Sequence, residues 1–330
     1  MAGQFILVID EGTTGTRAVI VDRDSRIRAS AYSEFTQFHP AADRVEHDAD
    51  EIWQATRAMI RKALDDGDLT LADVAAIGIT NQRATTVVWD RASGDPIAPA
   101  IVWQDTRTAD YIETTREAWA DKAYAHTGWA LAPVYSSLSL RWILENVPGA
   151  RAKADAGQLA FGTIDSWLIH RLTGGKVHAI AASNASVTGS YDLTKGEWYG
   201  EWLDFLGVPL SMFPEVCDDS GDFGTTDPAV LGAAIPITGA IADQHAAGLE
   251  RHVPVQVPVL AVDLGAGAEA GIGGAPGRLL LAVVLNGQRH RVGDAADGQV
   301  AGQAAIGLVN LLGLGGLEGH ERVVGHIQEE

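Results

Sequence analysis

The segment Asp10–Arg17, with the sequence DEGTTGTR, combines two glycines, three threonines, an arginine and an entering carboxylate. Gly12 and Gly15 allow the backbone to turn tightly and bring its N–H groups close to a phosphate. The threonines, among them Thr13 and Thr14, add hydroxyl donors. The segment therefore predicts a site for the phosphates of a nucleotide. A polar hairpin loop with two glycines is the alternative that the segment alone leaves open.

Charged residues stand at both ends of this turn. Asp10 follows the apolar run 5–9 and can hold Mg²⁺ through water. Arg17 precedes the apolar run 18–21 and can face phosphate charge or form a surface salt bridge. We interpret the two runs as the paired strands of a hairpin. The chain has no GxxxxGKS/T motif. The turn is followed by a strand, whereas a GxGxxG turn is followed by a helix, so the turn is of neither common nucleotide-binding type.

Alternating strands and helices are expected to position these residues. Asp48 is the expected N-cap of a helix over residues 51–64. The apolar face of this helix is predicted to contain Ile52, Ala55, Met59 and Ala63. Strands are expected over 75–80 and 85–89, with Asn81-Gln82-Arg83 at a strand end, where α/β proteins usually place their sites. Further helices are expected over 111–123, 137–144 and 164–172, and the whole pattern fits a layered α/β domain.

Several short segments in collinear order carry a family resemblance. They are the Asp10–Arg17 turn, Val45–Asp48 with Glu51–Trp53, Ile77–Arg83, Ala100–Gln104, Phe161–Ile169, Ser183–Ser186 and Asp243–Ala247. On these segments, residues 1–247 resemble the FGGY family of ATP-dependent carbohydrate kinases, and within it the glycerol kinases. The resemblance implies an amino-terminal domain with the actin-like, RNase H-like α/β fold. It also implies an active site in the cleft between this domain and a second one.

The resemblance implies roles for individual residues. Asp243 would be the catalytic base, although Ala242 precedes it where the family has glycine; a solvated or capping role is the alternative for such an Asp. Arg83 and Gln244 would hydrogen-bond substrate hydroxyls. Trp103 would form an apolar wall of the pocket, with core packing as the alternative. The implied cofactors are ATP and Mg²⁺, and the residues expected at their phosphates and metal are Thr13, Thr14, Gly15, Arg17 and Asp10.

The chain departs from the glycerol kinase pattern at several of these positions. Ala84 stands where that pattern has a glutamate that binds a glycerol hydroxyl. Farther along, the tyrosine of the pattern is displaced by one residue to Tyr135, and a lysine is replaced by Ser139. Ala84 and Tyr135 stay in the predicted substrate-binding set, but loss of the carboxylate widens the pocket, so we hypothesise a preference for a longer polyol such as a tetritol. In the phosphate turn, Glu11 replaces glutamine, and Gly15 replaces serine and removes one hydroxyl donor.

Residues 248–330 differ in composition from the rest of the chain. They contain no Ser, Thr, Lys, Met, Cys, Phe, Tyr or Trp, and apart from a few Ile and Asn they use amino acids whose codons begin with C or G. A GC-rich gene has G or C at most third codon positions, so a shifted reading frame that makes this base the first one yields such a restricted set of amino acids. We therefore expect a poorly ordered frameshift product where the carboxy-terminal domain of the family is missing. A natural low-complexity segment and a small domain without aromatic residues are the alternatives.

Composition limits the partners and the location. The formal charge of −19, from 24 basic and 43 acidic residues, argues against nucleic-acid and anionic-membrane partners. Cys217 is the single cysteine and excludes an intramolecular disulfide. No secretory signal pattern and no apolar run long enough to span a bilayer is seen. We expect a cytoplasmic protein whose partner is a small polyol, and the resemblance allows a homo-oligomer.

The predicted function is ATP-dependent phosphorylation of glycerol or a related small polyol. In the family the second domain supplies most of the adenine and ribose site and closes the cleft against water, so activity is expected to be impaired in this chain. Two alternatives stay open. One is a non-catalytic polyol- or phosphate-binding remnant, and the other is a non-functional frameshift product.

Overall fold

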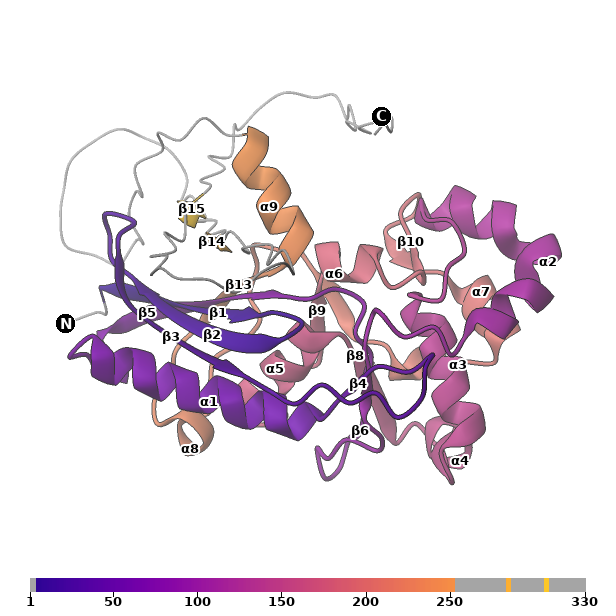
Figure 1. The fold of residues 1–330 in the computed structure, drawn as a ribbon, viewed down its shortest axis with the longest axis horizontal. Helices are drawn as coiled ribbons and strands as arrows, with labels where there is room; N and C mark the ends of the chain where they lie inside the picture. The colour runs from indigo at the N-terminus through magenta and orange to yellow at the C-terminus, as the bar shows by residue number, and fades with distance from the viewer. Residues whose placement is uncertain (1–3, 253–282, 286–305, 309–330) are drawn as a thin grey trace, which may run out of the picture.

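The computed structural model describes residues 4–252, 283–285 and 306–308 of the 330-residue chain (Figure 1). The predicted tail, residues 248–330, lies outside the described residues apart from the second half of helix α9 (Asp243–His252) and two short strands. These strands, β14 (Val283–Leu285) and β15 (Ile306–Leu308), pair antiparallel. The frameshift origin of the tail therefore stays a prediction.

A five-stranded sheet with the order β13-β5-β1-β2-β3 forms the centre of the fold. Its strands are β1 (Phe5–Glu11), β2 (Gly15–Val21), β3 (Ile27–Glu34), β5 (Val74–Asn81) and β13 (Ile237–Ala242). The predicted hairpin is confirmed, because β1 and β2 pair antiparallel on either side of the turn. Strands β5 and β13 run parallel to β1. The carboxyl ends of these three strands consequently lie at one edge of the sheet.

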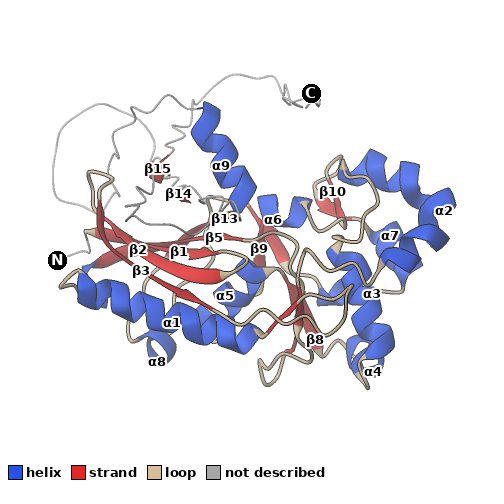
Figure 2. Ribbon diagram, viewed as in Figure 1, coloured by secondary structure: helices blue, strands red, loops and turns tan. Residues whose placement is uncertain are grey.

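Helix α1 (Ala49–Asp66) lies along one face of this sheet, and α9 lies on the other side (Figure 2). Asp48 is confirmed as the N-cap of α1, because its carboxylate accepts two backbone N–H groups of the first turn. Of the predicted apolar face, Ile52 and Ala63 are fully buried. Ala55 and Met59 are only half-buried, because the buried stripe is rotated toward the positions one residue later.

The other predicted elements differ from the structure mainly at their ends. Helix α5 (Ile164–Leu172) has the predicted bounds, whereas α2 (Ala109–Thr127) and α3 (Ser136–Asn146) are longer than predicted. Strand β6 (Val87–Asp90) begins two residues later than predicted and pairs with β8 (Leu159–Gly162) outside the main sheet. The remaining elements are β4 (Glu46–His47), β7 (Ala100–Ile101), β9 (Ala179–Ala181), β10 (Tyr191–Asp192), β11 (Glu197–Trp198), β12 (Glu215–Cys217), α4 (Ala150–Asp155), α6 (Ala182–Ser186), α7 (Gly200–Leu206), α8 (Pro228–Leu231) and the 3₁₀ turns Leu71–Asp73 and Leu210–Met212.

Two buried clusters stabilise the described part of the chain. The larger one lies between the sheet, α1 and α5, and includes Ile9, Ile52 and Trp167. The second joins α2, α3, α7 and β8 around Leu140 and Trp202, and Figure 1 shows these helices grouped at one end of the molecule. The larger cluster thus supports the sheet edge at which the predicted site residues lie.

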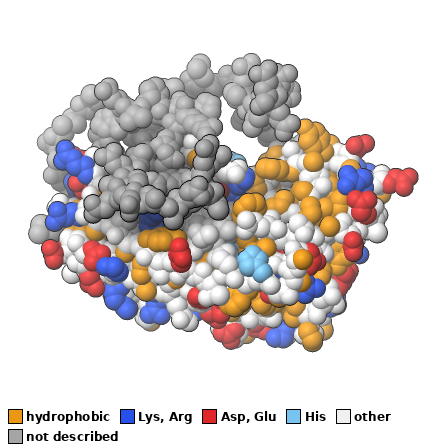
Figure 3. All heavy atoms as spheres, in the orientation of Figure 1, with side chains coloured by type: hydrophobic (Ala, Val, Ile, Leu, Met, Phe, Trp, Pro, Cys, Tyr) orange, Lys and Arg blue, Asp and Glu red, His pale blue; other side chains and the backbone are white. Residues whose placement is uncertain are grey.

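The surface combines scattered charges with an apolar region (Figure 3). Hydrophobic side chains gather on the part of this face that belongs to α2 and its neighbours. The exposed large hydrophobic residues of α2, α7 and the loops beside them are Tyr124, Trp129, Leu193 and Phe205. In the part of the chain that the structure describes, no helix is both long and apolar enough to cross a membrane.

Candidate active site

Three parallel strands bring the predicted catalytic residues to one edge of the sheet. Asp10 is the second-last residue of β1, Arg83 follows β5, and Asp243 follows β13 as the first residue of α9. The Arg83 Nε atom lies 3.4 Å from Asp243 Oδ1. The side chain of Arg83 is 21% exposed and that of Asp243 is 48% exposed, so the ion pair can be reached from solvent. The predicted position of Arg83 at a strand end is confirmed, and Asp10 and Asp243 lie at the ends of the two strands that flank β5.

The phosphate turn itself is closed by its backbone. The Gly12 N–H donates to the Gly15 carbonyl over 3.0 Å, and the Phe35 N–H donates to the Thr14 carbonyl over 3.4 Å. Thr14 is exposed and Thr13 is half-buried. Two of the predicted phosphate-binding threonines are therefore accessible at the tip of the hairpin.

Steric crowding explains why a glycine occupies position 15. A Cβ atom there would lie 2.6 Å from the Tyr32 hydroxyl oxygen and 2.5 Å from the Ser33 carbonyl oxygen of β3. Any side chain at this position would thus require β3 to move. Gly15 is the first residue of β2, and the reason for a glycine there is the close approach of Tyr32 and the β3 backbone.

A polar row crosses the sheet on the face opposite α1. Strand register places Thr80 beside Asp10, Asp10 beside Arg17 and Arg17 beside Tyr32. The guanidinium of Arg17 lies 5.5 Å from the Tyr32 ring centroid, within the range of a cation–π contact. Burial raises the pKa of Asp10 to about 6, with Arg17 opposing the rise and the charge of Asp243 adding to it.

This row fits a magnesium ion held largely by water and phosphate oxygens. The buried Thr80 Oγ1 atom, next to Asp10 in register, has no hydrogen-bond partner among the described residues. Within the same part of the chain, no group of three His, Cys, Asp or Glu side chains could form a complete metal cage. A single carboxylate with neighbouring hydroxyls is typical of Mg²⁺ sites that are completed by a bound nucleotide.

Glu11 points to the opposite face of the sheet, toward α1. It is fully buried, and Thr16 Oγ1 lies 2.8 Å from each of its carboxyl oxygens, while Thr56 Oγ1 lies 3.1 Å from Oε2. The Thr56 hydroxyl also donates to the Ile52 carbonyl over 2.9 Å. Burial raises the pKa of Glu11 to about 8, although the two threonine hydroxyls oppose the rise. Glu11 is therefore neutral at pH 7 and takes the place of an uncharged side chain beneath the turn.

Contacts from α6 hold the end of strand β13. The Ala242 N–H donates to Ser183 Oγ over 2.9 Å, and the Ser183 N–H donates to Asp219 Oδ1 over 2.8 Å. Asp243 also accepts the N–H of the adjacent Gln244 over 2.7 Å, but it is the first residue of α9 and not its N-cap, so the capping alternative is not supported beside the Arg83 pair. Partial burial raises the pKa of Asp243, while the Gln244 N–H and the Arg83 charge oppose the rise. Gln244 is exposed next to it.

A reciprocal amide pair joins α6 to β5. Asn184 Nδ2 donates to Asn81 Oδ1 over 2.9 Å, and Asn81 Nδ2 donates to Asn184 Oδ1 over 3.1 Å. Both side chains are fully buried. The pair thus fixes the end of β5 immediately before Arg83. Sequence reasoning placed both residues in matching segments but gave them no role.

Two exposed indoles lie on the predicted substrate side. Trp103 is 43% exposed, so core packing is wrong as an account of this residue. Trp129 is 40% exposed, and the Arg83 guanidinium lies 6.0 Å from its ring centroid. The sequence interpretation missed Trp129, whose only signal was an aromatic residue after the Gly128 helix terminus.

Ala84 and Tyr135 both lie behind this surface. Ala84 is 4% exposed, has a left-handed backbone with φ of 59°, and accepts the Ser136 hydroxyl at its carbonyl over 3.0 Å. Tyr135 is 1% exposed, and its hydroxyl donates to the Trp129 carbonyl over 2.6 Å. The predicted direct contact between Tyr135 and a substrate is therefore not supported, because the ring is enclosed in the second cluster and supports Trp129.

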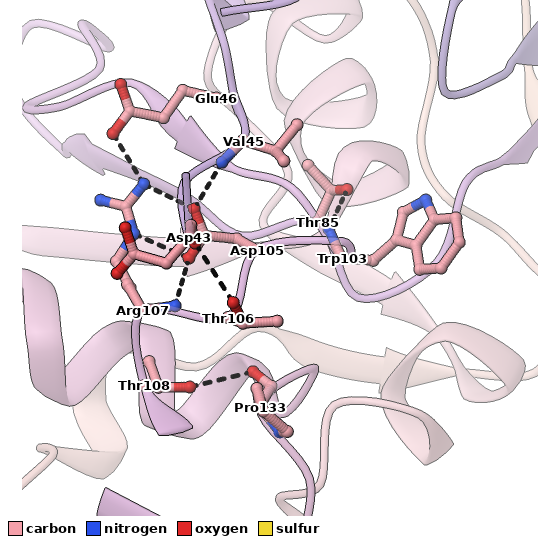
Figure 4. Close-up of polar contacts among 10 residues, drawn as sticks. All are labelled: Asp43, Val45, Glu46, Thr85, Trp103, Asp105, Thr106, Arg107, Thr108 and Pro133. Carbon is pink, nitrogen blue, oxygen red and sulfur yellow. Dashed lines mark hydrogen bonds and ion pairs between the residues drawn. The ribbon is translucent and has the colours of Figure 1, made fainter. Parts of the chain in front are cut away.

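A buried ionic network anchors the loop that carries Trp103 (Figure 4). Arg107 Nη2 lies 2.7 Å from both Asp105 Oδ2 and Glu46 Oε1, and the Arg107 and Asp105 side chains are each 2% exposed. Asp105 also accepts the Val45 N–H over 2.8 Å. The Trp103 N–H in turn donates to Thr85 Oγ1 over 3.3 Å. The loop is thereby fixed to its neighbours on both sides of the indole.

Comparison with known proteins identifies the family of this chain. The FGGY family of carbohydrate kinases, N-terminal domain, matches residues 5–249. The chain is 51% identical over 244 residues to the glycerol kinase of Brucella ovis, a match that covers 74% of this chain and 49% of that protein. It is 49% identical over 245 residues to the glycerol kinase of Methylobacterium nodulans, with the same coverage of each chain.

Solved structures show the same fold. The Plasmodium falciparum glycerol kinase with ADP superposes with a TM-score of 0.70 at 30% identity, over 75% of this chain and 50% of that one. The xylulose kinase from Rhodospirillum rubrum superposes with a TM-score of 0.68 at 23% identity, over 76% of this chain and 51% of that one. The second likeness shows the fold alone.

The chain therefore belongs to the FGGY family of carbohydrate kinases, and residues 5–249 have the actin-like α/β fold of its amino-terminal domain. The relatives that resemble it at about half identity are glycerol kinases. The chain spans about half the length of these relatives.

Proposed function

We propose that this site transfers the γ-phosphoryl group of ATP to a hydroxyl of a small polyol. The observation that carries the proposal is the meeting of the glycine turn, Asp10 and the Arg83–Asp243 pair at the carboxyl ends of three parallel strands. The similarity to glycerol kinases, one of them crystallised with ADP, supports the same reaction.

Each residue has a defined task in this reaction. The polyol oxygen attacks the γ-phosphorus, its proton passes to Asp243, and the bond to the ADP oxygen breaks. The raised pKa of Asp243 brings this carboxylate closer to the range of an effective base at neutral pH. Arg83 and Gln244 orient the polyol hydroxyls, and Thr13 and the turn amides hold the phosphates. Mg²⁺ would bind at Asp10 and neutralise phosphate charge.

We propose a four-carbon polyol as the better substrate. Ala84 offers neither a carboxylate nor an exposed side chain on the substrate side. The exposed Trp103 offers apolar surface that a longer carbon chain could cover more fully. The preference is tested by comparing glycerol with erythritol.

The reaction is tested with the purified 330-residue chain. Binding of glycerol, erythritol and MgADP is measured by calorimetry, and phosphorylation is measured by ADP release with the variant Asp243→Asn as control. We expect ligand binding with weak turnover, which the exchange of Asp243 lowers about 100-fold or more while polyol binding is retained. Binding without any turnover would favour the non-catalytic remnant. If the chain fails to bind MgADP, or fails to bind either polyol, the proposed function is refuted.

A further inference from the structure

A closed ring of hydrogen bonds joins the phosphate turn to the substrate wall. Trp103 Nε1 donates to Thr13 Oγ1 over 3.0 Å, and the Trp103 N–H donates to Thr85 Oγ1 over 3.3 Å. The Thr85 hydroxyl donates to Gln82 Oε1 over 2.8 Å, and Gln82 Nε2 donates to the Gly12 carbonyl over 3.1 Å. Because Gly12 precedes Thr13 in the chain, the ring closes on the turn itself.

The direction of each bond in this ring is fixed by chemistry. An indole N–H can only donate, whereas a threonine hydroxyl has one proton and two lone pairs. Thr13 therefore accepts from Trp103, and its own proton points elsewhere. Within the described part of the chain, this proton has no acceptor. The Thr13 hydroxyl is thus held as a donor for a ligand of the turn.

Contacts of the neighbouring backbone hold the Trp103 indole in position. Trp103 is too exposed to be fixed by packing alone. Its backbone is held by Thr85 on one side and by the buried Asp105–Arg107 ion pair on the other. A rigid support of this kind lets one exposed side chain orient another.

We propose that Trp103 is a positioning residue of the phosphate turn, where its indole N–H orients the Thr13 hydroxyl toward a bound nucleotide phosphate. This inference rests on the proposed function and adds a second role to the apolar wall. Binding of the nucleotide then depends on a side chain that belongs to the polyol side of the cleft. A wall that only contacts the polyol would have no such effect.

The two roles separate in the variant Trp103→Phe, which keeps an aromatic wall but lacks the N–H donor. Calorimetry on the full chain would measure MgADP and glycerol separately. We expect the affinity for MgADP to fall about 3- to 10-fold, the effect of one lost hydrogen bond, while the affinity for glycerol stays within about twofold. The matched control is Tyr124→Phe, which removes a hydroxyl donor from an exposed aromatic residue of α2 and should leave MgADP binding unchanged.

A double variant tests whether the effect passes through Thr13. In a Thr13→Val background, Trp103→Phe should cause no further loss of MgADP affinity. Unchanged MgADP binding in Trp103→Phe, or an equal loss in both backgrounds, would overturn the inference and leave the proposed function intact. If the unmodified chain binds no MgADP, the proposed function and the inference both fail.

Discussion

The neutral carboxyl group of Glu11 makes folding of this chain dependent on pH. The folded state keeps the Glu11 proton up to about pH 8, whereas the ordinary value for a glutamate is 4.5. Between these values the folded state binds more protons than the unfolded chain, so the free energy of unfolding falls as the pH rises. The stabilising contribution is complete below pH 4.5 and is lost by about pH 8.

The size of this effect follows from the same two values. At about 1.4 kcal/mol per pKa unit, the raised pKa of Glu11 contributes at most about 5 kcal/mol to the free energy of unfolding. About 3 kcal/mol of this contribution is lost between pH 5 and pH 8. The variant Glu11→Gln has no proton to lose. Its amide can donate to Thr56, whose own proton goes to the Ile52 carbonyl, and its oxygen can accept from Thr16, so the hydrogen bonds are kept.

Urea unfolding followed by tryptophan fluorescence would measure this at pH 5 and pH 8. We expect Glu11→Gln to become more stable relative to the unmodified chain by about 3 kcal/mol over that interval. The same exchange at Glu34, an exposed residue of β3, controls for the general effect of removing a carboxylate. A difference between Glu11→Gln and the unmodified chain that does not change with pH would refute the neutral, buried state of Glu11.

Three further predictions concern the strand ends. Asn184→Ala leaves the buried Asn81 amide without its partner and should lower the free energy of unfolding by about 2 kcal/mol in urea unfolding. As a control, Asn146→Ala at the exposed end of α3 should change it by less than about 0.5 kcal/mol. Ala84→Gly relieves a left-handed backbone and should raise stability by about 1 kcal/mol; a loss in the same assay would contradict the strain. Because the pKa of Asp10 is about 6, Mg²⁺-dependent ADP binding should strengthen from pH 5 to pH 7 in calorimetry, and a profile that is identical in Asp10→Asn would show that this carboxylate is not involved.

Local patterns explain what could be predicted from the sequence. The hairpin around the phosphate turn, the Asp48 N-cap and the bounds of α5 depend on neighbouring residues, so their signals lie within short windows. The position of Arg83 followed from a general rule about strand ends in α/β proteins, and the expected roles of Asp10 and Asp243 followed from the turn and from the family resemblance. These features required no knowledge of side-chain packing.

Contacts between distant segments account for what could not be predicted. Glu11 meets Thr56 across 45 positions, and Asn81 meets Asn184 across 103 positions. No local pattern encodes such pairs. Tyr135 was placed at the substrate by its motif, but its burial depends on Gly189, where a Cβ would lie 2.0 Å from the tyrosine ring. Shape complementarity of this kind appears only in the folded chain.

The contact between Tyr32 and Gly15 also limits which substitutions the hairpin tolerates. Tyr32 fills the volume into which a side chain at position 15 would extend, and the β3 backbone stands on the same side. The exchange Gly15→Ser would therefore introduce a clash before its hydroxyl could serve a ligand of the turn. As long as the hairpin is kept, the residues tolerated at position 15 and those tolerated on β3 depend on one another.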